Sequence, residues 1–582
     1  MGESRAQSRE RVEHVARRAL EGAGQWQGTP LDRLKLEAIA CGRVPGEQDR
    51  EFASDASKPL ALLRFDSDAI ASFVYESSRP PVIAGASALL RKLNEDLADQ
   101  FRDQTLFSGG GEGLLLLPLD GAAAAGQEIE RLFHERTCGA LKVTVAWLPV
   151  GARDFLALHA AESAPSHGVR LASGTPAVLA RLHDRIRRLK DERYPEAGEV
   201  AGNQPRCASC RDRSGALPLA YRRPDETGLL CRPCDHRWEV GRREIQGTTF
   251  EEVVAEYAQA RGEDDAERSP AHQLAMLYAD GNGMGTLFGR IDSLSDLRFL
   301  SEAVRAVFAA LDSRVERELA KWLKRSDSES LPWISLLAGG DEGIWILPAA
   351  VALEAAEKLP GWLDKEVAGS AELSALLLKH RLPGLSLGMG LVICQPNYPV
   401  RYQYELAKVL QKNAKSLYYG RGEQPPSSSL DFEVLTDASP LSEDLEALRR
   451  LVYSTDEPGF STSCRPYFAR GFTELRELLK QAESRKVSGS QVRALAEAAR
   501  EGEAVFLNFL RYQLGRKGTG EPLQDWLRRS GFEPSDRVQV QAFAVREVAP
   551  GARATWLADA LEIAPYLIES PTEEEEVPDA AA

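Results

Sequence analysis

The sequence predicts an α+β protein in which two ferredoxin-like domains flank a four-cysteine zinc ribbon and a helical domain follows them. The first observation is an internal repeat: SGGGEGLLLLP at 108–118 and AGGDEGIWILP at 338–348 agree almost residue for residue. In each copy an apolar run ending in acids comes before the segment, and a helix and a strand-like run come after it. The second observation is a pair of CxxC motifs between the copies. Because the element order matches as well as the motif, we favour an internal duplication over two unrelated glycine hairpins.

The chain begins with a charged helical segment, residues 1–58, and the first α+β domain is predicted at 59–200. Its first strand ends in Asp66 and Asp68. Continuous apolar runs bounded by turn residues indicate strands, and helical spacing of apolar residues indicates helices. The predicted elements are a strand at 60–68, a helix near 87–94, the glycine hairpin at 106–118, an alanine-rich helix at 121–136, a strand at 141–147 and a basic helix at 178–193.

The zinc ribbon is predicted at 201–248 from two cysteine pairs separated by 20 residues. Each CxxC knuckle places two thiolates on one turn, and the loop between the knuckles brings the pairs together around one ion. Four thiolates leave no open position for a substrate, so the site should be structural. A redox CxxC is the weaker alternative, because neither pair sits at a strand-to-helix step. The predicted Zn²⁺ ligands are Cys207, Cys210, Cys231 and Cys234.

The second α+β domain, predicted at 249–425, repeats the order of the first. Its predicted elements are a strand at 274–280, a helix at about 294–325, the GG hairpin at 333–347, a helix from 349 to 357 and a strand at 385–393.

Acidic residues lie at two strand ends of this domain. Asp280 closes the first strand, and Asp341 and Glu342 lie in the hairpin turn. Hard cations such as Mg²⁺ or Mn²⁺ bind carboxylate and triphosphate oxygens together and stabilise both the attacking and the leaving oxygen. We therefore predict a nucleotide-handling site with Asp280, Asp341 and Glu342 as catalytic residues and the two aspartates as metal ligands. The alternative is a glycine hairpin whose acids are merely solvated.

Glycines and one lysine complete the predicted nucleotide site. Gly281, Gly339 and Gly340 leave room for the backbone to approach phosphates, because they carry no Cβ. Lys415 follows the last strand on a helix, from which its amine could reach a triphosphate. A solvated helix lysine is the alternative interpretation.

The first domain keeps Asp66, Asp68 and Glu112 but has Gly111 where the second has Asp341. One fewer acid at the hairpin tip predicts weak or absent metal binding. This half more plausibly holds the acceptor nucleotide or a partner.

The remainder of the chain is predicted to be a helical C-terminal domain, 426–570, and an acidic disordered tail, 571–582. Amphipathic stretches cover 473–486 and 490–513, and alternation predicts a strand at 538–545. The net charge of −15 argues against a protein that coats nucleic acid nonspecifically, although a local basic groove remains compatible with it. Without a signal core or an apolar run of membrane-spanning length, a cytoplasmic location without membrane contact is expected.

The order of palm, zinc ribbon, palm with a GGD turn and helical domain resembles the large polymerase-like subunit of type III CRISPR effector complexes. More distantly, the hairpin is similar to that of GGDEF cyclases. The matching segments are FDSDAIASFVYESSRPPVIAGASALL, CASC…CRPC, YADGNGMG, AGGDEG and LSLGMGLVICQPNYPVRYQYELAKVLQKNAK, which cover most of 60–420.

The resemblance implies that the second palm converts ATP to cyclic oligoadenylates when a complex with guide RNA and other CRISPR-associated subunits binds target RNA. It would make Asp280, Asp341 and Glu342 the metal-binding acids and Lys415 a phosphate contact. Three departures are visible: no HD nuclease segment precedes the first palm, so DNA cleavage is not expected; Glu342 replaces the second aspartate of a GGDD motif; and Asn282 stands where many relatives carry an acid. A silent scaffold subunit is the main alternative. A homodimeric GTP-using cyclase is less favoured, because this chain supplies both facing palms itself.

Overall fold

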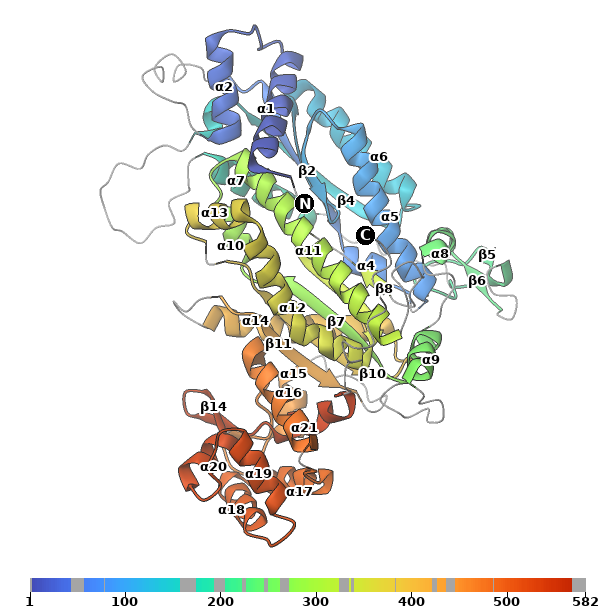
Figure 1. Cartoon of the computed structure of the whole chain (residues 1–582). Helices are drawn as coiled ribbons and strands as arrows, with labels where there is room; N and C mark the ends of the chain where they lie inside the picture. Colours follow the sequence, from blue (N-terminus) through green and yellow to red (C-terminus); the bar gives the residue numbers. More distant parts are fainter. Residues whose placement is uncertain are drawn as a thin grey trace, which may run out of the picture.

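The structure is a computed structural model that describes residues 3–42, 57–77, 79–156, 174–192, 205–221, 227–244, 250–261, 272–323, 334–336, 340–382, 384–420, 426–435, 445–484 and 486–567. Figure 1 shows the two α+β domains stacked on one another, with the C-terminal helices at the far end of the second domain. The predicted fold class is confirmed. None of the described helices is both long and apolar enough to span a membrane.

The first domain is a four-stranded antiparallel sheet with the ferredoxin-like order β2-β3-β1-β4. Helices α5 and α6 cover one face, where Leu63 and Phe65 of β1 are buried. Helix α7 covers the other face, where Leu182 and Ile186 pack in one core with Leu60 and Leu62. The elements are β1 (Leu60–Asp68), α4 (Ile70–Tyr75), α5 (Pro80–Gln100), β2 (Thr105–Gly109), β3 (Glu112–Pro118), α6 (Ala122–Arg136), β4 (Lys142–Val150) and α7 (Thr175–Glu192).

The second domain contains the same four-strand core, β8-β9-β7-β10, within a six-stranded sheet. Its elements are β7 (Leu274–Gly281), α10 (Met284–Gly289), α11 (Leu294–Leu323), β8 (Ile334–Leu336), β9 (Glu342–Pro348), α12 (Ala349–Gly369), α13 (Ala371–Lys379), β10 (Leu387–Cys394) and α14 (Val400–Gly420). Two further strands, β11 (Ser429–Val434) and β13 (Tyr467–Phe468), continue the sheet beyond β10. The predicted boundary at residue 425 therefore falls between two paired strands of one sheet.

The duplication extends to the strand register. In the first domain Leu60 pairs with Pro118 and Asp66 with Glu112. In the second domain Leu274 pairs with Pro348, and Asp280 takes the place of Asp66 opposite Glu342. Because one residue of slippage would turn every side chain to the other face of the sheet, this agreement places equivalent residues at equivalent positions.

The two domains contact one another reciprocally. Helix α5 of the first domain contacts β8 of the second, and α11 of the second contacts β2 of the first. Such exchange of equivalent contacts is the pattern of an isologous interface between two copies of one fold. The hairpin tips of both domains therefore lie along the same interface.

Smaller elements frame the two domains. Helices α1 (Arg5–Gly22) and α2 (Pro30–Cys41) pack against α11, and both begin with a capping box. The cysteine-containing unit consists of β5 (Leu217–Pro218), β6 (Leu229–Leu230) and α8 (Arg232–Glu244), followed by α9 (Phe250–Arg261). Helix α8 crosses α5 closely where Gly85 meets Gly241: a Cβ at Gly85 would lie 1.8 Å from the carbonyl oxygen of Arg237.

The C-terminal domain is mainly helical, as predicted, with a small three-stranded sheet. The segment 490–513 forms two helices that are separated at Gly502, whose φ of +116° suits glycine. The elements are α15 (Leu445–Tyr453), β12 (Phe460–Ser461), α16 (Ala469–Ser484), α17 (Gly489–Arg500), α18 (Glu503–Leu514), α19 (Glu521–Arg529), α20 (Arg537–Ala544), β14 (Arg546–Ala549), β15 (Ala552–Ala554) and α21 (Leu557–Ile563). The acidic tail at 571–582 lies outside the described residues.

The predicted strand at 538–545 is wrong, because this segment is helix α20. Asp536 caps the helix by accepting hydrogen bonds from the backbone N–H groups of Val538 and Gln539. Val540 and Phe543 are buried, whereas Val538 is 75% exposed. The residues that alternate in polarity also include buried residues at helical spacing, so the pattern fits either a strand or a helix. The Asp536 cap favours the helix.

Candidate functional site

The predicted acids of the second palm meet at one edge of its sheet. Asp280 ends β7 directly opposite Glu342, which begins β9. Asp341 occupies the preceding turn, and its carbonyl oxygen accepts a hydrogen bond of 3.0 Å from the backbone N–H of Gly281. All three acids are half-buried. The structure therefore brings together the acids that the sequence places about sixty residues apart.

Lys415 joins this cluster from α14. Its Nζ lies 2.8 Å from Oδ2 of Asp280 and donates to the carbonyl oxygen of Gly281 at 3.0 Å. Gln411, one turn earlier, donates to the same carboxylate at 3.0 Å. These contacts fix the Asp280 carboxylate and place a positive charge beside the strand end. The assignment of Lys415 as a phosphate contact itself stays a prediction.

It is unfavourable for all three carboxylates of this cluster to be ionised at once. Burial, with added repulsion from Asp280, Glu342 and Glu112, raises the pKa of Asp341 to about 7. Burial also raises the pKa of Asp280, against the lowering effect of Lys415, and burial together with the charge of Asp280 raises the pKa of Glu342. In the described part of the chain, Asp341 and Glu342 have no ion pair with a basic side chain. A divalent cation bound by these carboxylates would relieve this repulsion, and carboxylate oxygens are ligands that Mg²⁺ and Mn²⁺ accept.

The two strand ends lie near one another, because Ser67 and Ile70 of the first palm line the same cavity as Glu342 of the second. The first-palm turn is held by Gly111, where a Cβ would approach the Ser67 hydroxyl to 2.2 Å. In the second palm, space at Gly340 is open, and a Cβ at Gly281 would meet the Met284 side chain at 2.7 Å. Gly339, the remaining predicted glycine, lies outside the described residues.

The amide nitrogen of Asn282 is held by Ser386. The residue is buried, its Nδ2 donates to the Ser386 hydroxyl at 3.0 Å, and its backbone N–H donates to the Ser386 carbonyl oxygen at 2.8 Å. Its side chain thus ties the loop after β7 to the segment before β10.

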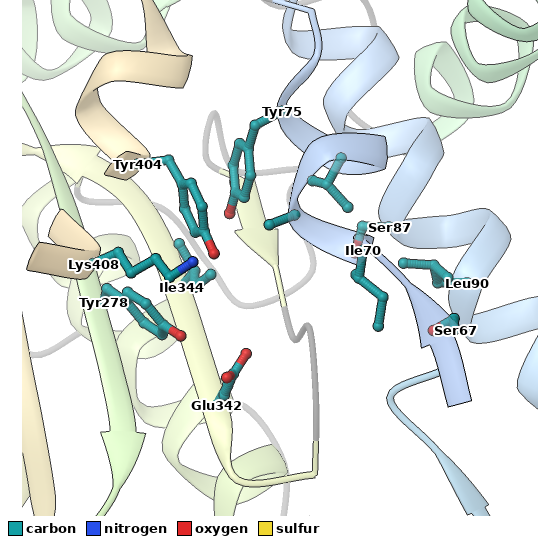
Figure 2. A pocket seen from close by; sticks show the side chains of 12 residues that line it. Ser67, Ile70, Tyr75, Ser87, Leu90, Tyr278, Glu342, Ile344, Tyr404 and Lys408 are labelled. Carbon is teal, nitrogen blue, oxygen red and sulfur yellow. The ribbon is translucent and has the colours of Figure 1, made fainter. Parts of the chain in front are cut away.

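A cavity of about 250 Å³ lies between the palms next to this cluster. Figure 2 shows side chains from both palms pointing into it: Glu342 and Lys408 come from the second palm, and Ile70 and Leu90 come from the first. Three tyrosines line it, with ring centroids 4.2 Å apart for Tyr75–Tyr404 and 6.0 Å apart for Tyr278–Tyr404.

The sequence analysis predicts Glu342 but none of the three tyrosines that line this cavity. The Tyr75 hydroxyl is buried and has no hydrogen-bond partner in the described structure. Its ring stacks on that of Tyr404. Tyr278 could have been found from the sequence, because it lies two positions before Asp280 and must share its face of β7. Tyr75 could not, since it comes from the other palm.

The four predicted cysteines converge as expected. All are buried and free, and their sulfur atoms lie within 4.8 Å of one another. Hydrogen bonds reach the sulfurs from the Cys231 backbone N–H to Cys207 at 3.2 Å and from Arg237 to Cys234 at 3.2 Å. Thiolates that accept such bonds and share one small volume are the donor set of a tetrahedral Zn²⁺ site.

The cysteine unit is anchored to the first palm by ion pairs. Glu76, just after α4, accepts two hydrogen bonds from Arg213, at 2.8 and 2.9 Å, and another from Arg237. Arg213 also donates to the sulfur of Cys210 at 3.8 Å. The cysteine site and the palm are thus linked through residues that contact both.

Comparisons with known proteins agree with this architecture. Residues 273–422 match the family model described as Cas10/Cmr2, second palm domain. A crystal structure of a Csm1-Csm4 cassette in complex with cA4 is similar with a TM-score of 0.50 and 14% identity, covering 92% of this chain and 72% of that chain. A Csm1-Csm4 cassette with pppApA gives a TM-score of 0.49 at 13% identity over 95% and 72% of the two chains, and Csm1 of T. onnurineus gives 0.47 at 14% identity over 88% and 70%. No curated protein sequence matched this chain.

The family model covers the strands, the acids and the lysine of the cluster described above. The similarity to the Csm1-Csm4 cassette with cA4, with a TM-score of 0.50, covers 92% of this chain and shows a common fold. Residues 273–422 are therefore similar to the second palm domain of Cas10/Cmr2, and the chain as a whole has a fold similar to that of Csm1.

Proposed function

We propose that this protein is a metal-dependent nucleotidyltransferase that makes cyclic oligoadenylate-type messengers from ATP in a type III CRISPR-like defence system. The observation that carries the proposal is the cluster of Asp280, Asp341 and Glu342 at the inter-palm interface. Its repelling carboxylates fit a divalent cation, and Lys415 adds a fixed positive charge. An aromatic cavity opens directly beside it.

Asp280 and Asp341 would hold the Mg²⁺ or Mn²⁺ ion, with Glu342 as the third acid of the cluster. When bound, the ion supplies charge neutralisation for the triphosphate. The palm orients two nucleotides so that the 3′-hydroxyl oxygen of one attacks the α-phosphorus of the other. The new bond is a phosphodiester, the bond from the α-phosphorus to the bridging oxygen breaks, pyrophosphate leaves, and the hydroxyl proton passes to solvent.

The tyrosines of the cavity supply flat apolar surfaces on which a base could lie, since base–aromatic stacking contributes about 1–3 kcal/mol per base. The first palm contributes one side of this cavity, with Tyr75 and Ile70, so one nucleotide would contact both palms. This arrangement supports the assignment of the first palm as the holder of the acceptor nucleotide.

We propose Zn²⁺ for the four cysteines, on the strength of their sulfur convergence and their hydrogen bonds. The ion would be structural, because four thiolates fill the tetrahedral coordination sphere and leave no open position for a substrate. Guide and target RNA and further CRISPR-associated subunits are proposed as partners by analogy, since several similar structures contain Csm1 together with Csm4.

The alternative is a silent scaffold subunit of a ribonucleoprotein. The specific observation in its favour is that the Asp280 carboxylate is already paired with Lys415 and hydrogen-bonded by Gln411. Asp341, which has no such partner among the described residues, argues for the enzyme.

The test is to incubate the purified protein with ATP or GTP and Mn²⁺, with and without RNA, and to identify products by mass spectrometry. Asp280→Ala and Asp341→Ala should each remove product while leaving the fold intact, because loss of a well-placed catalytic group costs on the order of 10²–10³ in rate. Glu501→Ala is the matched control, since Glu501 is an exposed turn acid in the C-terminal domain. If Asp341→Ala converts ATP as fast as the parent protein, the scaffold interpretation replaces the enzyme.

A further inference from the structure

The acid cluster of the first palm already contains a positively charged group. Helix α7 follows β1 along its length, and its last turn brings Lys190 to the end of the strand. The Nζ of Lys190 lies 3.0 Å from Oδ1 of Asp66 and 3.1 Å from Oδ1 of Asp68. It also donates to the carbonyl oxygen of Ser67 at 3.2 Å. Three oxygens from one strand end thus surround one ammonium.

Lys190 is the structural counterpart of Lys415. The strand register equates Asp66 with Asp280, and so equates Ser67 with Gly281. Each lysine pairs with the equivalent aspartate and donates to the carbonyl oxygen of the next residue. The two lysines come from helices that follow the last strand of their domains, α7 after β4 and α14 after β10. The internal duplication therefore includes this lysine, which no sequence motif links between the two halves.

The two palms differ in how much negative charge is left over. In the first palm, Lys190 contacts two aspartates, and Arg64 pairs with Glu112 at 2.6 Å. Asp68 is further bound by the Thr144 hydroxyl at 3.0 Å. Each acid of the first cluster is thus held by a basic side chain.

In the second palm, Lys415 contacts only Asp280, while Asp341 and Glu342 have no ion pair within the described residues. The position of Asp68 is occupied there by Asn282, and the position of Asp341 is occupied in the first palm by Gly111. Among the described residues, the three acids of the first palm are ion-paired with two basic side chains, Lys190 and Arg64, whereas the three acids of the second palm have one ion-paired basic side chain, Lys415.

We propose that Lys190 is the built-in cation of the first palm: it fills the space between Asp66 and Asp68 and so keeps this palm free of divalent metal, leaving the second palm as the single metal site of the pair. An ammonium 3.0 Å from one carboxylate and 3.1 Å from the other repels a second cation and occupies the oxygens that would bind it. Nucleotide phosphates at the first palm would accordingly meet Lys190 instead of an ion. This part of the inference rests on the proposed function, whereas the metal-binding part does not.

The experiment measures Mn²⁺ bound to the full-length chain by electron paramagnetic resonance, without nucleotide. The parent protein should bind one Mn²⁺ at the palms, lost in Asp341→Asn and unaffected by Asp66→Asn. Lys190→Met keeps the length of the side chain but removes its charge, and it should add a second Mn²⁺. Asp66→Asn combined with Lys190→Met should return the count to one. Lys190→Arg, which keeps a cation, should stay at one.

Two results would overturn the proposal. One is a parent protein that binds two Mn²⁺ ions, of which Asp66→Asn removes one. The other is a folded Lys190→Met variant, judged by circular dichroism, that gains no Mn²⁺; Lys190 would then be a structural ion pair only. If Lys190→Met does not fold, the comparison of the parent with Asp66→Asn still decides. Failure of the proposed function would be seen separately, as the absence of any Mn²⁺ that depends on Asp341 together with the absence of product.

Discussion

Replacing Asp341 by asparagine should stabilise the metal-free protein at neutral and alkaline pH. The pKa of Asp341 is raised from 3.8 to about 7 by burial and by the neighbouring acids. In the unfolded chain the group ionises near its ordinary pKa, whereas in the folded chain it keeps its proton up to about pH 7. The stability of the metal-free protein should therefore fall as the pH rises from about 4 to 7 and then level off. Asparagine cannot ionise, so the stability of the Asp341→Asn variant should not fall in this way as the pH rises.

The magnitude follows from the same pKa. Each pKa unit corresponds to about 1.36 kcal/mol, so ionising Asp341 costs the folded state at most about 4 kcal/mol. Because the side chain is only half-buried and solvent screens part of the repulsion, we expect about 2 kcal/mol. In a domain of about 150–250 residues, 1 kcal/mol shifts the Tm by about 2–4 °C, so we expect Asp341→Asn to raise the Tm by about 4–8 °C.

The assay is thermal unfolding of parent and Asp341→Asn in EDTA at pH 5 and pH 8, repeated with Mn²⁺. The difference in Tm should be clearly smaller at pH 5 than at pH 8, where it reaches its full value. Mn²⁺ should raise the Tm of the parent at pH 8, because ligands that bind only the folded state stabilise it, and should do little for the variant. A variant that is less stable than the parent at pH 8 in EDTA, or a difference that does not depend on pH, would refute the reasoning.

Three further outcomes are expected. Changing Cys207 and Cys231 together to serine should remove about one zinc per chain in metal analysis and lower the Tm, because structural zinc contributes to folding; a folded, zinc-free parent whose thiols are freely alkylated would contradict the zinc site. Glu112→Ala should reduce product formation less than Asp341→Ala does, since Glu112 pairs with a basic side chain in the first palm; equal losses would mean that both palms are catalytic. Glu342→Asp should keep or raise ATP conversion, measured as product per minute, because it preserves a carboxylate at a ligand position; complete loss would show that the longer side chain is required.

Much of the fold could be predicted from the sequence, because the relevant signals are local. The glycine turn between two apolar runs specifies a hairpin, and an apolar strand that ends in acids places Asp280 beside it once the strands pair. Two CxxC knuckles need only a loop to meet, and the four sulfurs do converge. The repeated order of elements carries these features into both halves of the chain. Each of these predictions depends on residues that are close in the sequence or related by the repeat.

Only the tertiary structure decided which distant side chains share a site. Lys190 lies more than one hundred residues from Asp66 in the sequence, and its helix reads locally as an ordinary basic amphipathic helix; packing against β1 sets the turn at which it meets the acids. Tyr75 joins Tyr404 only because the palms stack on one another. Strand β11 extends the palm sheet because the exposed edge of β10 accepts it, which no local pattern encodes. Local periodicity defines the elements, whereas charge pairing and cavity lining depend on how faces from distant segments are brought together. The proposed catalytic site of this palm depends on that second level.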